Sequence, residues 1–306
     1  MKPRVVAIVQ ARVGSTRLPN KVMRTMGSKP MIELLLSRLA RAQEIDQIVL
    51  ATSTHPANEP LVDCVQRLGY PVVRGSEDDV LERFVLAAKE QAADVVIRIT
   101  GDCPLVDPGL VDLAVQHFFA SVVDSLSNTT TPTYPDGLDI EVFTFRSLKQ
   151  ASDETQKPFD REHVTPYLRT SGRFLVGNMR HDEDLSQLRW TVDEPADFEV
   201  VEQVFRYFAP RLDFTWHEVL DLQRQHPEWF SPNQHLIRNQ GATMSTGQKL
   251  WKRAKQVIPG GNMLLSKRAE MFLPEQWPAY FSKAKGCTVW DMDGRAYTDM
   301  SIMGIG

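Results

Sequence analysis

The chain has 306 residues, of which 42% are hydrophobic and 24% charged, and its formal net charge is −4 at pH 7. These values are typical of a globular protein with enough apolar residues for a sizeable core. The net negative charge gives no support for a nucleic-acid partner, because binding a polyanion normally needs a concentrated basic face.

The number of cysteines and the lengths of the apolar runs indicate the cellular compartment of the protein. The three cysteines, Cys64, Cys103 and Cys287, are too few and too scattered for a disulfide framework or a zinc site, and they suit a reducing cytoplasm. The apolar run Val5–Val9 is too short for a signal peptide, and no stretch approaches the ~20 apolar residues of a membrane span. We therefore expect a cytoplasmic protein without a membrane partner.

The first hundred residues alternate apolar strands with amphipathic helices. The pattern predicts the strands Val5–Gln10, Gln47–Ala51, Pro71–Val73 and Asp94–Ile99, and the helices Met31–Gln43, Asn58–Leu68 and Asp78–Gln91. Strands that alternate with helices in this order favour a doubly wound α/β fold with a mostly parallel sheet.

The remainder of the chain is less regular. Its pattern predicts the strands Ser121–Ser127, Leu138–Phe143 and Leu188–Val192, the helices Arg161–Arg169 and Ala196–Phe208, then a helix Gly247–Val257 and a hairpin of Thr288–Trp290 and Ala296–Met300. The segment Ser231–Ser245 is polar and without periodicity, as in a linker. We divide the chain into a domain of residues 1–232, a linker of residues 233–245 and a segment of residues 246–306.

The last segment is short for an independent domain. About 60 residues with one helix and one hairpin can hardly form a stable core, and the final residues are apolar. Two explanations are open: the segment docks onto the first domain, or it is the beginning of a longer domain that is truncated here. We expect truncation.

A polar loop follows the first predicted strand, from Ala11 to Lys21. In open α/β sheets, ligands bind at the carboxyl ends of strands. The loop offers Gly14, where the backbone can approach a phosphate closely, and three cations and two hydroxyl groups: Arg12, Arg17, Lys21, Ser15 and Thr16. We interpret Ala11–Lys21 as a phosphate-binding loop; the alternative is a basic surface loop whose charges are solvated.

Two carboxylates follow later strands. Asp102 lies on a turn after the strand Asp94–Ile99, at the same predicted sheet edge as the loop, and suits a Mg²⁺ ion that bridges phosphate oxygens. The alternative is that Asp102 or Asp107 caps the helix near Pro108, and Asp107 fits that role better. Asp193 precedes Pro195, so it is a helix N-cap at least as readily as a metal ligand.

These motifs resemble the CMP-ulosonate synthetase family, which includes the acylneuraminate and 3-deoxy-manno-octulosonate cytidylyltransferases, and most of all its spore-coat-polysaccharide-type branch. The resemblance spans roughly residues 3–235, and its carriers are Gln10–Lys21, Gly75–Arg83, Thr100–Pro108, Pro135–Glu141, Arg161–Tyr167 and Trp190–Asp197. One departure is Asn20, where the family loop usually has glycine; asparagine also tolerates left-handed backbone conformations.

The resemblance implies a Rossmann-like nucleotidyltransferase fold that binds CTP and transfers CMP to a sugar acid. It implies that Asp102 and Asp193 hold Mg²⁺ and that Arg12, Lys21 and Asp102 are catalytic. It places the nucleotide on Ala11, Arg12, Gly14, Ser15, Thr16, Arg17, Lys21 and Arg74, and the acceptor on Asp136, Asp139, Glu141, Arg161 and His163. Purely structural roles remain open for Arg74 and for the acceptor residues. Homodimers are common among such enzymes, and a homodimer is possible here.

The segment Leu250–Gly261 and the hairpin region Lys285–Asp299 resemble the start of a class III aminotransferase of the glutamate-1-semialdehyde aminomutase type. Such enzymes bind pyridoxal phosphate on a lysine far downstream, outside this chain, so we expect no transamination. Two other functions stay open for the first domain: nucleotidyl transfer to a sugar 1-phosphate, and a non-catalytic nucleotide- or sugar-binding module.

Overall fold

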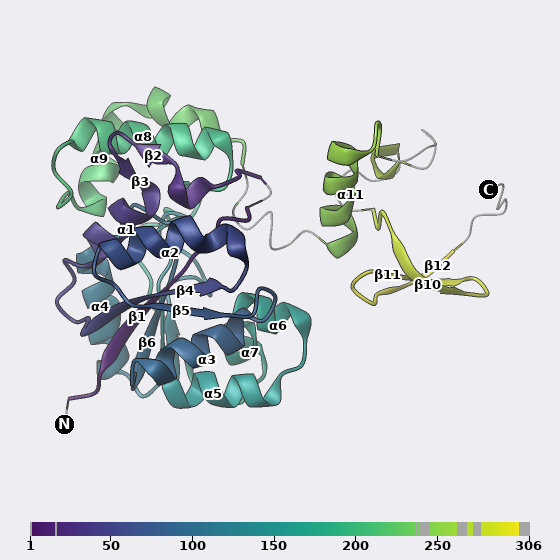
Figure 1. The fold of residues 1–306 in the computed structure, drawn as a ribbon, viewed down its shortest axis with the longest axis horizontal. Helices are drawn as coiled ribbons and strands as arrows, with labels where there is room; N and C mark the ends of the chain where they lie inside the picture. The colour runs from purple at the N-terminus through teal and green to yellow at the C-terminus, as the bar shows by residue number, and fades with distance from the viewer. Residues whose placement is uncertain are drawn as a thin grey trace. The chain divides into compact units, whose positions relative to one another are not determined.

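The computed structural model of the chain describes residues 2–15, 17–236, 238, 245–261, 268–271 and 277–299. The chain divides into two compact units, Met1–Leu236 and Ile237–Gly306 (Figure 1). The first unit carries all of the residues that the sequence suggests for the site, and each unit is described by itself below.

A seven-stranded sheet forms the centre of the first unit, in the order β5-β4-β1-β6-β8-β7-β9. Its parallel half consists of β5 (Val72–Gly75), β4 (Gln47–Ser53), β1 (Val5–Gln10) and β6 (Val95–Thr100). β8 (Glu141–Thr144) runs antiparallel to β6 and to β7 (Ser125–Ser127), and β9 (Val176–Asn178) is parallel to β7. The predicted α/β fold with a mostly parallel sheet is confirmed.

Helices cover both faces of this sheet. The inner strand β1 has apolar side chains on each face, and both sets of side chains are buried under helices. Val5, Ala7 and Val9 pack into one core cluster and Val6 and Ile8 into the other. Figure 1 shows α3 (Val80–Glu90), α5 (Phe145–Glu154), α6 (Pro158–His163) and α7 (Pro166–Thr170) together on one side of the sheet. The other core cluster takes residues from α1 (Met31–Leu39), α2 (Glu59–Arg67), α4 (Pro108–Ala120), α8 (Pro195–Phe208) and α9 (Trp216–Gln225).

Several expected elements differ from the structure. Leu188–Val192 is not a strand: the backbone amide of Val192 donates to the carbonyl of Asp102 (2.8 Å), and the isolated bridge from Asp136 to Arg189 replaces a ladder. The expected helix Arg161–Arg169 is two helices, α6 and α7, because Val164 has a positive φ of 72°. The predicted strands Ser121–Ser127 and Leu138–Phe143 are the shorter β7 and the shifted β8.

The start of the expected linker is ordered. Pro227–Asn233 forms a 3-10 helix (η3), in which Phe230 and Asn233 are buried. The first unit therefore extends to Leu236, into the segment that we expected to be a linker because its sequence is polar and without periodicity. The central part of the linker, residues 239–244, lies outside the described residues.

The second unit contains α11 (Thr246–Val257) and a three-stranded antiparallel sheet of β10 (Phe281–Lys285), β11 (Thr288–Asp291) and β12 (Ala296–Thr298). The hairpin of β11 and β12 is as predicted, with Gly294 at a positive φ of 79° in its turn. Residues 300–306 lie outside the described residues. Across the described parts of both units, we find no helix with the length and apolarity needed to cross a membrane.

Candidate active site

The expected phosphate-binding loop and the turn that carries Asp102 lie side by side. β1 and β6 are neighbouring parallel strands, so their carboxyl ends meet at one sheet edge. The amide of Gly101 donates to the carbonyl of Gln10 (2.8 Å), and a Cβ atom on Gly101 would lie 2.7 Å from that of Ala11. Glycine at residue 101 therefore permits the close approach of the loop to the Asp102 turn.

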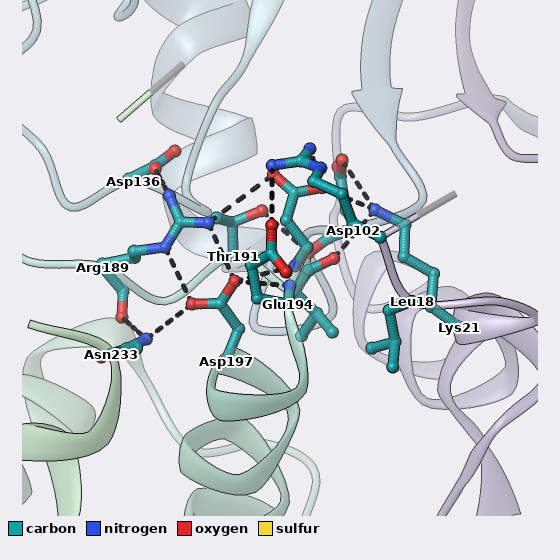
Figure 2. A network of polar contacts seen from close by, with 12 residues as sticks. Leu18, Lys21, Asp102, Asp136, Arg189, Thr191, Glu194, Asp197 and Asn233 are labelled. Carbon is teal, nitrogen blue, oxygen red and sulfur yellow. Dashed lines mark hydrogen bonds and ion pairs between the residues drawn. The ribbon is translucent and has the colours of Figure 1, made fainter. Parts of the chain in front are cut away.

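Lys21 joins this edge to Asp193. Its Nζ atom lies 2.8 Å from Asp193 Oδ1 and 3.4 Å from Asp102 Oδ2, and it donates to the carbonyl oxygen of Val192 at 2.9 Å. Figure 2 shows the Lys21 side chain directed at Asp102. The structure thus brings together the two carboxylates expected as metal ligands, and it places a cation between them.

The charges in this group determine its protonation. Burial by itself lowers the pKa of Lys21, but Asp102 and Asp193 together raise it above its ordinary value. Burial raises the pKa of Asp102, whereas the charge of Lys21 and a hydrogen bond from Thr100 outweigh it and bring this pKa to about 2. Lys21 is therefore an ammonium ion near neutral pH, so it acts as a fixed positive charge and not as a base.

Asp193 is not the N-cap of the following helix. The N-cap of α8 is Glu194, which forms a capping box with Asp197, and Pro195 is the first helical residue. The side chain of Asp193 is thereby left to Lys21 and to Arg17, whose Nη2 lies 2.9 Å from Asp193 Oδ1. The N-cap alternative for Asp193 is wrong, while Asp107 caps α4 as expected, accepting from the amide of Leu110 (2.8 Å).

A chain of polar contacts holds the first half of the loop. The buried side chain of Asn58 accepts from the amide of Val13 (2.8 Å) and donates to the Ser53 hydroxyl (2.7 Å). Ser53 in turn donates to Glu77 (2.9 Å), and Glu77 forms an ion pair with Arg12 at 3.1 Å. These contacts fix the positions of Arg12 and Val13 in the loop.

The second half of the loop contains the departure from the family pattern. Asn20 adopts a left-handed conformation with φ 58°, in the region of backbone conformation that glycine favours. Gly14 is exposed, and the Ser15 hydroxyl accepts from the amide of Leu18 (3.4 Å). Thr16, expected at the nucleotide, lies outside the described residues. Arg74 lies at the end of β5, where it pairs with Glu59 (2.7 Å) and donates to the carbonyl of Thr54.

Two of the residues expected at the acceptor are buried ion-pair partners. Asp136 accepts from Arg189 at 2.9 Å. Glu141 contacts Arg98 and accepts from the Thr165 hydroxyl (2.7 Å). Burial raises the pKa of Glu141, but the charges of Arg98 and Arg169 outweigh it, so this pKa lies below its ordinary value.

The other expected acceptor residues lie elsewhere in the unit. Arg161 pairs with Asp79 and donates to two carbonyl oxygens, and the ring of His163, at the end of α6, lies 4.4 Å from that of Phe159, centroid to centroid. Asp139 is partly buried in the turn before β8. The contacts of these residues are with other parts of the protein, and their binding of an acceptor substrate stays a prediction.

Sequence reasoning missed the residues that support the loop and Asp193, which are Ser53, Asn58, Glu77, Arg189, Asp197 and Asn233. Asp197 had a partial signal, because it stands three positions after Glu194, which is the spacing of a capping box, although the usual residues there are Ser or Thr followed by Glu or Gln. The other five residues had no such signal, since none of their contacts belongs to a recognisable local motif, even where the partner is as near as Asn58 is to Ser53.

The donor set fits a divalent cation that also has ligands from a substrate. No group of three or more His, Cys, Asp or Glu side chains in the described part of the chain is arranged to hold a metal ion by itself. Asp102 and Asp193 supply two carboxylates that already share the Lys21 ammonium. Mg²⁺ is commonly bound by one or two carboxylates together with waters and substrate phosphates, so this pair is sufficient.

The polar loop, the buried lysine and the two carboxylates lie at the carboxyl edge of a parallel sheet, where α/β proteins commonly bind ligands. Residues 6–226 match the model of the cytidylyltransferase family, so the chain belongs to that family. The chain is 33% identical over 235 residues to the spore coat polysaccharide biosynthesis protein SpsF of Bacillus subtilis. The matched region covers 73% of this chain and 95% of that protein.

Two further similarities concern a named enzyme and a solved structure. The chain is 29% identical over 119 residues to the 3-deoxy-manno-octulosonate cytidylyltransferase of Trichlorobacter lovleyi, covering 38% of this chain and 46% of that enzyme. A solved cytidylyltransferase from Leptospira borgpetersenii superposes with a TM-score of 0.72 and 29% identity, covering 77% of this chain and 98% of that one. The family match is therefore accompanied by a match of the fold.

Proposed function

We propose that this chain transfers CMP from CTP to a sugar acid and releases pyrophosphate, in the biosynthesis of a surface polysaccharide or glycan. The observation that carries the proposal is Lys21, whose ammonium group joins Asp102 to Asp193 beside the loop. Membership of the cytidylyltransferase family supports CTP as the donor. The names of the Bacillus and Trichlorobacter relatives support a sugar acid and a polysaccharide pathway.

The loop and its cations bind and orient the triphosphate. Exposed Arg12 and half-buried Arg17 offer N–H groups to phosphate oxygens, and Lys21 supplies a buried positive charge at the same edge. A hydroxyl group of the sugar acid attacks the α-phosphorus, and the bond to pyrophosphate breaks. Little covalent chemistry falls to the protein in such a transfer, so positioning and neutralisation of charge carry the catalysis.

We assign Asp102 and Asp193 as ligands of Mg²⁺. When bound, the ion neutralises charge on the phosphate oxygens. The carboxylate of Asp102 stays ionised, with a pKa of about 2, so it is ready to bind a cation at any physiological pH. The acceptor residues Asp136, Asp139, Glu141, Arg161 and His163 and the nucleotide contact of Arg74 remain predictions in this proposal.

A pyrophosphate-release assay over four nucleoside triphosphates, each with sugar acids and with sugar 1-phosphates, tests the function. We expect turnover with CTP and a sugar acid. Turnover with sugar 1-phosphates alone would show an NDP-sugar synthase instead, and CTP binding without turnover on any acceptor would show a binding module.

Substitution of Asp102 tests the metal assignment. The Asp102→Asn variant keeps the shape of the side chain, so we expect it to bind CTP in the absence of metal and to lose turnover. Undiminished turnover in this variant would remove Asp102 from the metal site.

For the second unit we propose a likeness to class III aminotransferases. The support is the likeness of Leu250–Gly261 and Lys285–Asp299 to class III aminotransferases, together with a small antiparallel sheet and the helix α11, in which Trp251 and Ala254 are buried. A spectrum of the purified chain with added pyridoxal phosphate tests for a cofactor lysine: we expect no aldimine absorbance, because the two matched segments do not include the lysine that binds the cofactor in those enzymes.

A further inference from the structure

We propose that Arg189, Asp197 and Asn233 form a positioning unit for Asp193, and that this unit sets the affinity of the site for its divalent cation. The inference rests on the proposed function, because it takes Asp193 as a metal ligand. It goes beyond that function by naming residues that touch neither substrate nor metal.

Asp197 is the centre of the unit. Its carboxylate is completely buried and its Oδ2 atom accepts from the backbone amides of Asp193 and Glu194, both at 2.9 Å. Two backbone amides bound by one oxygen fix the path of the chain at Asp193, immediately before α8. Any shift of Asp197 is therefore transmitted to the backbone that carries the Asp193 side chain.

Arg189 fixes Asp197 and also contacts Asp193. Its Nε and Nη2 atoms donate to the two oxygens of Asp197, each at 2.8 Å, and its Nη1 donates to Asp136 at 2.9 Å (Figure 2). The same Nη2 lies 3.6 Å from Asp193 Oδ2. Asp193 thus has Lys21 and Arg17 at Oδ1 and Arg189 at Oδ2, which restricts rotation of its carboxylate.

Asn233 closes the unit from a distant part of the chain. It lies at the end of η3, is buried, and its Nδ2 donates to Asp197 Oδ1 (2.9 Å) and to the carbonyl oxygen of Arg189 (3.2 Å). Figure 2 shows Asn233 beside Asp197 and Arg189, with its side chain directed at both. The segment that the sequence suggested as a linker therefore completes the support of Asp193.

The geometry predicts more than a stabilising role. A bidentate guanidinium–carboxylate pair is directional, and lysine cannot reproduce it although its charge is the same. Loss of hydrogen bonds behind a metal ligand typically lowers metal affinity 10- to 100-fold. A network that acted through charge alone would tolerate lysine at residue 189, and a merely structural network would leave metal affinity unchanged once the protein is folded.

The test is Mn²⁺ binding to the full chain with CTP present, followed by the electron paramagnetic resonance signal of the ion against a blank of Mn²⁺ and CTP without protein. We expect Arg189→Lys to raise the Kd for Mn²⁺ about 10-fold, and Asn233→Ala, which removes one of several supports of Asp197, to raise it by a smaller factor. The matched control is Asp160→Asn, which alters another buried carboxylate. Asp160 lies in α6, and its Oδ2 atom accepts from the Thr155 hydroxyl at 2.7 Å. This control should lower the thermal midpoint and leave the Kd unchanged.

The outcomes separate the inference from the proposed function. If wild type binds Mn²⁺ and folded Arg189→Lys binds it equally well, the positioning unit is refuted. If Asp160→Asn weakens binding as much as Arg189→Lys, the effect is general destabilisation and the inference is also refuted. Should Arg189→Lys fail to fold, the Asn233→Ala variant decides alone. Wild type that binds no Mn²⁺ would overturn the metal assignment of Asp193, and the inference with it.

Discussion

Lys21 is the residue whose replacement gives the most specific prediction. Lys21→Met keeps an apolar stem of similar length and removes the ammonium that contacts Asp193, Asp102 and the carbonyl of Val192 at 2.8, 3.4 and 2.9 Å. Asp102 then loses the cation that it contacts, and Asp193 keeps only its ion pairs with Arg17 and Arg189. The variant should lose stability without metal, lose turnover, and respond more strongly to Mg²⁺ than the wild type does.

The magnitudes follow from burial and charge. Removing one partner of a fully buried ion pair costs about 3–5 kcal/mol. The side chains of Asp193 and Asp102 are 19% and 29% exposed, so water screens part of the loss. We therefore expect a decrease of about 2–3 kcal/mol in the free energy of unfolding. Loss of a charge that stabilises the transition state should lower kcat by about 10²–10³.

Metal should reverse part of the loss of stability. A ligand that binds the folded state stabilises it by RT ln(1 + [L]/Kd), and Mg²⁺ should bind more tightly when Lys21 no longer competes for the carboxylates. At about 10 mM Mg²⁺ we expect the gain in the variant to exceed that in wild type by about 1–2 kcal/mol.

Urea unfolding with a chelator and with Mg²⁺, beside pyrophosphate release, measures these quantities. The control is Lys149→Met, which removes an exposed helical lysine from its pair with Asp153. It should change neither the free energy of unfolding nor the rate of pyrophosphate release. Equal unfolding free energies for wild type and Lys21→Met in the chelator, with equal gains from Mg²⁺, would refute the reasoning.

Three further substitutions test other parts of the unit. Asn58→Leu leaves the amide of Val13 without its partner, so KM for CTP should rise about 10-fold and the unfolding free energy should fall by about 1–3 kcal/mol; an unchanged KM would show that the loop needs no such support. Glu141→Gln should lower stability by about 3 kcal/mol at pH 7. Because the pKa of Glu141 is lowered in the fold, its stabilisation is present above its ordinary pKa of 4.5 and lost as the pH falls through the folded pKa. Unfolding curves should therefore converge with those of wild type in acid, and a difference independent of pH would contradict the assignment. Gly101→Ala brings a Cβ to 2.7 Å from that of Ala11, so it should cost about 1–3 kcal/mol by calorimetry, and a midpoint equal to that of wild type would show that the loop moves freely.

The sequence by itself predicted the fold class and named several residues that lie together in the candidate site. Alternating apolar strands and amphipathic helices predicted the parallel half of the sheet, because local hydrophobic periodicity directly reflects which faces are buried. It also indicated Asp107 as the cap of α4 and Asn20 as a substitute for glycine in the loop, and the structure confirms both. These features depend on neighbours within a few residues, which a sequence shows.

Only the tertiary structure decided which side chains meet. Lys21 lies 81 residues from Asp102 and 172 from Asp193, so their contacts depend on how β1, β6 and the segment before α8 pack together. The same packing explains why Leu188–Val192 is not a strand, since its amides bond to Asp102 and Asp136 and not to a neighbouring strand. A sequence shows the types of polar groups available, and the fold alone determines their partners, because a buried donor bonds to the acceptor that packing places beside it.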